Sequence, residues 1–102
     1  MRVITRIRTL SLAEADLYDG YLFYERKEPG VGAYFFDSLS SDVESLRLYA
    51  GIHRRVLGYH RMLATRFPFG IYYDIEGEEA RVWRVLDCGK NPRWIKEQLK
   101  WR

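Results

Sequence analysis

Apolar positions follow two different periods along this chain, helical in the first half and strand-like in the second. After an imperfect alternation over residues 2–8, which predicts a short strand, apolar residues recur three or four positions apart over residues 13–24. This spacing predicts a helix from Ser11 to about Lys27, and Ser11 with Glu14 has the form of a capping box at its start.

A second apolar stripe follows a break at Pro29 and Gly30, and it runs from Val31 to Leu46. Because only a few residues connect the two stripes, we expect the helices to lie antiparallel as a hairpin.

The second half contains three strand-like runs, at about residues 56–67, 69–75 and 80–88. The last two are joined by residues 76–79, which include a glycine suited to a hairpin turn, and Pro68 marks a bend between the first two. The expected class is therefore α+β: an N-terminal strand, an antiparallel two-helix hairpin, and a three-stranded antiparallel meander forming one small sheet. One face of that sheet is expected to pack on the helices and the other to stay partly exposed.

Composition limits the chain to one domain, residues 1–102, since 47% hydrophobic residues supply one core. A single cysteine, Cys88, cannot form an internal disulfide, and no leader segment opens the sequence, so we expect a cytoplasmic protein. No apolar run approaches the length of about 20 residues that crosses a bilayer, and no membrane contact is expected.

Charge is divided unevenly between the two halves. Residues 1–51 carry six basic and eight acidic side chains, whereas residues 52–102 carry eleven and six. The basic half suggests an acidic partner such as nucleic acid or an acidic peptide, although a solvated surface of an ordinary domain explains it equally well.

Three segments together resemble a known family. Residues 67–77, FPFGIYYDIEG, are similar to the FPYxIYYxxEG segment of RelE/ParE toxins of the plasmid stabilisation type. The YE…PGVG…F pattern of residues 24–35 resembles the helix-hairpin turn of that family, and VLDCGKNPRW at 85–94 resembles its closing strand, VLHxRRDPxxW. The resemblance covers nearly the whole chain in the right order.

The resemblance implies the toxin of a type II toxin-antitoxin pair, with a cognate antitoxin wrapped along the sheet. Tyr72, Trp83 and Trp94 are the candidates for an antitoxin groove on the face that the helices leave free. For any single one of these aromatic residues, a place in the core is the more common alternative.

The toxin's target is left open by the resemblance, because the family includes both DNA gyrase inhibitors and ribosome-dependent mRNA nucleases on one fold. RNA cleavage needs a general base, a general acid and cations at the phosphate, and the candidates for catalysis are His60, Arg61 and Arg84. The candidates for binding nucleic acid or another target are Arg66, Lys90 and Arg93.

The closing segment departs from the nuclease pattern. Asp87 and Cys88 stand at and beside the family's histidine, Gly89 replaces the first of its paired basic residues, and no tyrosine follows Tyr73. We expect Cys88 to be a small buried residue at the strand end and not a nucleophile. The leading hypothesis is a gyrase inhibitor that acts by binding. A ribosome-dependent mRNA nuclease and a degenerate toxin that retains only antitoxin binding are the alternatives.

Metal and cofactor sites are not expected. His53, His60 and Cys88 do not have the spacing of a zinc site, and Gly30 with Gly32 lacks the rest of a dinucleotide motif. A homodimer or a hetero-oligomer with the antitoxin is possible, and the tail from Trp94 either folds back on the sheet or stays mobile until a partner binds.

Overall fold

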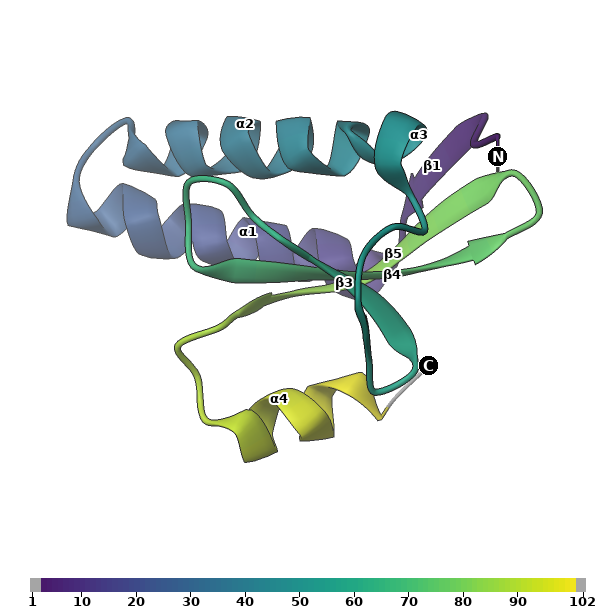
Figure 1. Ribbon diagram of the computed structural model, residues 1–102. Helices are drawn as coiled ribbons and strands as arrows, with labels where there is room; N and C mark the ends of the chain where they lie inside the picture. Colours follow the sequence, from purple (N-terminus) through teal and green to yellow (C-terminus); the bar gives the residue numbers. More distant parts are fainter. Residues whose placement is uncertain (1–2, 101–102) are drawn as a thin grey trace.

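The computed structural model describes residues 3–100, which form a five-stranded sheet between two helical layers (Figure 1). A hairpin of two long helices lies on one face of the sheet, and a C-terminal helix lies on the other. In chain order the elements are β1 (Arg6–Thr9), α1 (Ser11–Lys27), α2 (Val31–Glu44), α3 (Leu46–Tyr49), β2 (Arg55–Val56), β3 (Tyr59–Leu63), β4 (Phe69–Glu76), β5 (Glu79–Asp87) and α4 (Pro92–Leu99).

The predicted helical hairpin is confirmed, and Glu25 of α1 holds its turn. The Glu25 carboxylate accepts hydrogen bonds from the backbone N–H groups of Gly30 at 3.1 Å and Gly32 at 3.0 Å. These groups belong to the start of α2, so Glu25 takes the place of an N-cap across the turn. A Cβ at Gly32 would lie 2.6 Å from the backbone oxygen of Tyr21, which is why the helices can approach only at a glycine.

The predicted capping box at the start of α1 does not form. The helix begins at Ser11, as expected, but its N-cap residue is Leu10 and no side chain caps it. Ser11 is thus one position too far along the chain to satisfy the first orphan N–H groups. The second helix also differs from the prediction, since α2 ends at Glu44 and Leu46 begins the short α3.

The sheet has five strands in the order β1-β5-β4-β3-β2, so the prediction of a three-stranded meander is incomplete. The run predicted at 56–67 is interrupted at Leu57 and Gly58, which both have positive φ, as a type I′ turn between β2 and β3 requires. Residues 64–68 then leave the sheet. Asp42 of α2 holds this loop by accepting hydrogen bonds from the N–H of Thr65 at 2.9 Å and from its hydroxyl at 3.0 Å.

The predicted first strand becomes β1, and it pairs in parallel with β5. Arg2, with which the prediction began, lies outside the described residues. The expected antiparallel pairing is confirmed for the later strands, with β4 between β3 and β5.

Two apolar cores lie on the two faces of the sheet. The larger core joins the hairpin to the sheet, and residues such as Phe35, Leu39 and Val82 are fully buried there. The smaller core lies under α4, which buries Leu99 against the far face. The prediction that this face stays open is therefore wrong, because the C-terminal residues fold back on it as a helix.

The position of α4 is fixed at both of its ends. Its last turn is held by Tyr59, whose hydroxyl donates to the backbone oxygen of Leu99 at 3.2 Å. At its start Asn91 caps the helix by accepting from the N–H of Arg93 at 2.7 Å, and Pro92 occupies the first turn. Trp101 and Arg102, the last residues of the predicted tail, lie outside the described residues. Between residues 3 and 100, no helix has the length and apolar character needed to cross a bilayer.

Candidate functional site

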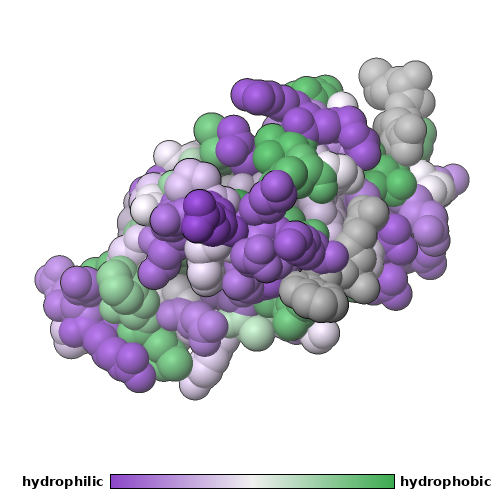
Figure 2. All heavy atoms as spheres, turned by 90° about the horizontal axis from the view of Figure 1, so that it is seen from below, coloured by the Kyte–Doolittle hydropathy of each residue, from purple (hydrophilic) through white to green (hydrophobic). Residues whose placement is uncertain are grey.

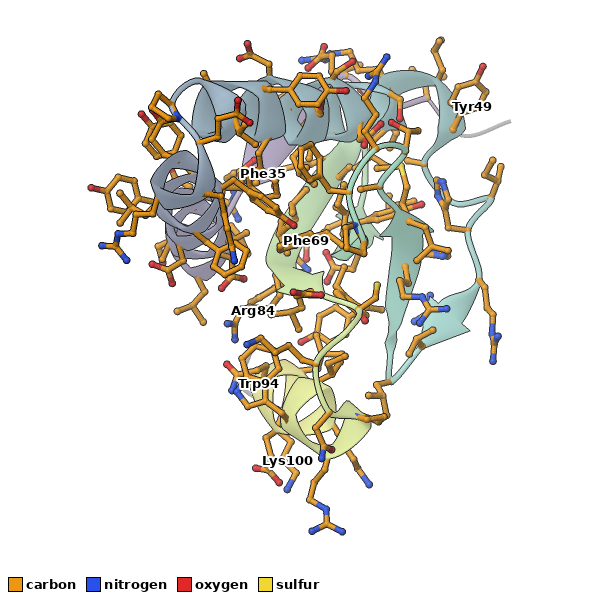
Figure 3. All side chains as sticks on the ribbon, turned by 90° about the vertical axis from the view of Figure 1, so that its left-hand side faces the viewer. Phe35, Tyr49, Phe69, Arg84, Trp94 and Lys100 are labelled. Atoms are coloured by element: carbon orange, nitrogen blue, oxygen red, sulfur yellow. The ribbon has the colours of Figure 1, made fainter. Side chains whose placement is uncertain are left out.

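A cleft opens between α1, the C-terminal end of β5 and α4, with a cavity volume of about 410 Å³. It brings together Arg84, Lys90 and Trp94, to which the sequence assigned three different roles. Figure 3 shows Arg84 and Trp94 below Phe69, between the sheet and α4. Asp16, Asp19 and Asp87 also line the cleft, so its charge is mixed and not simply cationic.

Arg84 is held in place by Asp16 of α1. Its guanidinium donates to the two carboxylate oxygens of Asp16 at 2.7 and 2.9 Å, and to the backbone oxygen of Gln98 at 3.1 Å. This bond with Asp16 is the main reason why the pKa of Arg84 is raised, although burial opposes the shift. Arg84 thus joins α1, β5 and α4, and it is engaged within the protein and not available to a phosphate.

A bulge in β5 explains why Asp16 is needed. The register between β4 and β5 shifts between Tyr72 and Tyr73, and β1 pairs with β5 only as far as Val82. Beyond that residue β5 has no strand partner on this side. The Asp16 carboxylate takes over by accepting from the backbone N–H of Val85 at 2.9 Å.

Lys90 and Trp94 form the exposed rim of the cleft. The side chain of Trp94 is 40% exposed, and the ammonium of Lys90 lies 5.9 Å from the centre of its ring. An aromatic ring and a cation that are both exposed are suited to contact with another macromolecule.

His60 lies on the opposite face of the sheet from Arg61. The two residues are adjacent on β3, so their side chains point to opposite faces. The His60 ring stacks on Tyr73, which belongs to the hairpin core, with 5.1 Å between ring centres. Its Nδ1 lies 2.8 Å from the backbone oxygen of His53, so Nδ1 carries a proton and donates it to that oxygen.

Arg61 faces α4, where it contacts the hydroxyl of Tyr72. Burial raises the pKa of Tyr72, and the bond and charge of Arg61 oppose that shift. Cys88 at the end of β5 is exposed, so the expectation that it is buried is wrong. The pKa of its thiol is raised, first by desolvation and then by the charge of Asp87, which disfavours the thiolate.

The three residues predicted for catalysis are thus not brought together. His60 contacts Tyr73 on the hairpin face, Arg61 contacts Tyr72 on the α4 face, and Arg84 is paired with Asp16. A nuclease needs its base and its phosphate-binding cations around one reacting group, and this arrangement does not supply them.

The other predicted residues are scattered as well. Arg66 is exposed on the loop between β3 and β4, and Arg93 is exposed in the first turn of α4. In the expected antitoxin groove Tyr72 is only 1% exposed, and Trp83 is half-buried beside it in the core under α4. Only Trp94 of that set is exposed. Figure 2, seen from the side of α4, accordingly shows a largely hydrophilic face with apolar groups scattered over it.

A second, larger cavity is a groove that the sequence did not indicate, of about 600 Å³, along the two helices of the hairpin and β1. Its apolar wall includes Tyr18, which is 60% exposed, and Phe36. Its rim carries Glu14, Glu44 and Arg47, and Arg47 is itself bonded to Glu44. The feature of the sequence that could have indicated this groove is a second aromatic stripe on α1, which includes Tyr18 and is offset from the stripe that faces the core.

The arrangement of these elements matches that of a solved protein. A chain of the structure described as "Chromosomal ParDE TA system from P. aeruginosa" superposes with a TM-score of 0.72, over 80% of this chain and 94% of that chain, at 21% sequence identity. The chain has a RelE/ParE-type fold. The expected fold is therefore confirmed, with the strand β2 and the helices α3 and α4 in addition to the predicted elements. No protein-family model and no curated protein matches the sequence. Because one fold can serve several activities, the RelE/ParE-type fold alone does not identify the activity of this chain.

Proposed function

We propose that this protein is the toxin of a type II toxin-antitoxin, or plasmid stabilisation, module, and that it inhibits growth by binding a macromolecular target. DNA gyrase is the target we favour. One observation carries the choice of binding over RNA cleavage: His60, Arg61 and Arg84 lie in three separate environments on a RelE/ParE-type fold.

The surface we assign to the target is the rim of the cleft, formed by Lys90 and Trp94. Both side chains are exposed, while the Asp16–Arg84 pair beneath them is fixed. Interfaces depend on a few aromatic and cationic residues at their centre, so these two are the strongest candidates.

Gyrase supercoiling by the purified enzyme, in the presence of a large excess of this protein, tests the proposal. We expect inhibition, and a substantial loss of it in Lys90→Gln and Trp94→Ala. Lys96→Gln is the matched control, because Lys96 is also exposed on α4 but does not line the cleft. Normal supercoiling at a large excess of the toxin would remove gyrase as the target.

The same preparation distinguishes the alternatives. Fragmented messages on translating ribosomes, with cleavage lost in His60→Ala or Arg84→Ala while the fold survives, would support the mRNA nuclease. A protein that binds an antitoxin but causes no growth arrest when expressed in a bacterial host would be a degenerate toxin.

The antitoxin surface we propose is the groove along the hairpin, because α4 covers the face predicted from the sequence. Because Arg47 already pairs with Glu44, the acidic Glu14 and the exposed Tyr18 favour a segment with apolar residues in the centre and a basic residue at the edge. This differs from the acidic peptide expected from net charge alone.

Affinity for the cognate antitoxin tests the proposed antitoxin surface. We expect Tyr18→Ala to weaken the complex at least tenfold, as truncation of an interface anchor does. Tyr49→Ala is the control, since Tyr49 is also an exposed tyrosine and lies outside the groove. Equal effects of the two variants would place the antitoxin elsewhere.

A further inference from the structure

The segment between Glu44 and Asp74 contains no acidic residue, but five arginines and two histidines. It includes α3, β2 and β3, of which the two strands form the edge of the sheet remote from β1, and it ends within β4. Of the basic residues in this segment, only Arg47 lines the groove at the helical hairpin, and none lines the cleft at α4. The cationic character of this edge therefore has no role in the proposed function.

Two of these basic residues face each other on the β2–β3 hairpin. Arg55 and His60 are register partners, and one guanidinium nitrogen of Arg55, Nη1, lies 3.4 Å from Nε2 of His60. The other nitrogen, Nη2, donates to the backbone oxygen of Gly58 at 3.1 Å, which fixes the guanidinium over the turn. The 3.4 Å contact is longer than an ordinary hydrogen bond, so these two nitrogens interact only weakly with each other.

Arg55 and His60 border a polar cavity of about 570 Å³ that lies between the β2–β3 hairpin, Gly51 and β4. The one carboxylate in its wall belongs to Asp74, and Arg81 holds that carboxylate in a two-bond ion pair, with both distances 2.8 Å. The ion pair of Arg81 with Asp74 offsets the negative charge of Asp74, which would otherwise repel an anion.

We propose that Arg55 and His60 form a binding site for an oxyanion of the phosphate class. Two donors about as far apart as these nitrogens can each reach one oxygen of a tetrahedral anion. His60 Nδ1 already donates to the backbone oxygen of His53, so the ring is oriented and a proton at Nε2 points toward the anion. The anion then replaces the weak contact between the two side chains with two charge-assisted hydrogen bonds.

Titrations of the full chain at constant ionic strength test the site, with inorganic phosphate, a DNA duplex and a single-stranded RNA of matched length. For at least one of these we expect Arg55→Gln and His60→Gln to weaken binding about tenfold, the usual effect of removing one charge-assisted hydrogen bond. Arg54→Gln is the matched control, because Arg54 is exposed and carries the same charge but does not border the cavity. We expect it to change affinity less than twofold.

The three ligands separate the sources of the anion. If the variants weaken the binding of inorganic phosphate alone, the ligand is a free anion. If they weaken the binding of DNA or RNA, the ligand is the phosphodiester backbone of that nucleic acid. In the unaltered protein, the imidazole signals of His60 in an NMR spectrum should shift on addition of the ligand, which makes the test independent of how the variants fold. Equal losses in Arg54→Gln and Arg55→Gln, or unshifted His60 signals, would overturn the proposal.

Discussion

Replacement of Asp16 by alanine tests the central claim about the cleft, that Arg84 is a structural residue. Asp16 accepts two hydrogen bonds from the guanidinium of Arg84 and one from the backbone N–H of Val85. The side chains of Asp16 and Arg84 are each only 11% exposed. Asp16→Ala therefore leaves a largely buried cation and a strand N–H group without their partner.

The expected loss of stability follows from these contacts. Removing one partner of a buried ion pair costs about 3–5 kcal/mol, and an orphaned buried N–H costs about 1–3 kcal/mol. Because both side chains keep some exposure, water offsets part of each penalty, and we expect a total of about 3–5 kcal/mol. A domain of this size has a free energy of unfolding of about 5–15 kcal/mol, so the variant lies close to unfolding.

Urea denaturation of four proteins measures the effect: Asp16→Ala, Arg84→Met, the double variant, and Asp19→Ala as control. Asp19 is exposed in the same cleft, and its replacement should change stability by less than about 0.5 kcal/mol. The double variant should lose less than the sum of the single variants, because the two side chains interact directly. Wild-type stability in Arg84→Met would refute the structural role and return Arg84 to the candidates for phosphate binding.

Three further predictions follow from single contacts. Gly20→Ala should destabilise the protein by about 1–2 kcal/mol in urea denaturation, because the new Cβ would lie 2.5 Å from the buried ring of Phe35. This clash outweighs the gain of about 1 kcal/mol in helix propensity. Adding Phe35→Leu to the Gly20→Ala variant should restore part of the loss. Leu57→Asn should stabilise the protein by about 0.5–1 kcal/mol, because Leu57 in the β2–β3 turn has a φ of 53°, which asparagine tolerates better than leucine. An unchanged free energy of unfolding in urea would contradict this prediction. The pKa of His53 is lowered, first by burial and then by the charge of His60, so the unfolded chain binds the proton more readily. Stability should thus be complete above about pH 6.5 and fall as pH drops below that value, and an equally steep fall in His53→Gln would exclude this cause.

The sequence predicted those parts of the fold that depend on neighbouring residues. The two apolar stripes and the Pro29–Gly30 break gave both helices, because a hairpin with so short a turn has one compact arrangement. Leu57 shows where local signals fail, since leucine is not a turn residue and its positive φ is imposed by the pairing of β2 with β3. The parallel pairing of β1 with β5 could not be predicted either, because an alternating pattern indicates a strand but not the strand with which it pairs.

The candidate site depends even more on contacts distant in the sequence. Arg84 and Asp16 are separated by most of the chain, and the bulge that makes Asp16 necessary arises from the register between β4 and β5. The sequence did place Lys90 and Trp94 among the candidates for contact with a partner. It could not show that α4 covers Tyr72, because an amphipathic tail does not reveal which surface it packs on.

The burial of the motif residues explains why resemblance predicts this fold better than its target. Within the segment FPFGIYYDIEG, Phe69, Ile71, Tyr72 and Tyr73 are all buried, so selection for a stable sheet is sufficient to keep them similar. The exposed rim of the cleft has no such constraint, because Lys90 supports no core contact. Substitutions there can change what the protein binds at little cost in stability, which is how one fold comes to serve different targets. Variants of the exposed residues around α4 are therefore the ones that test the proposed target.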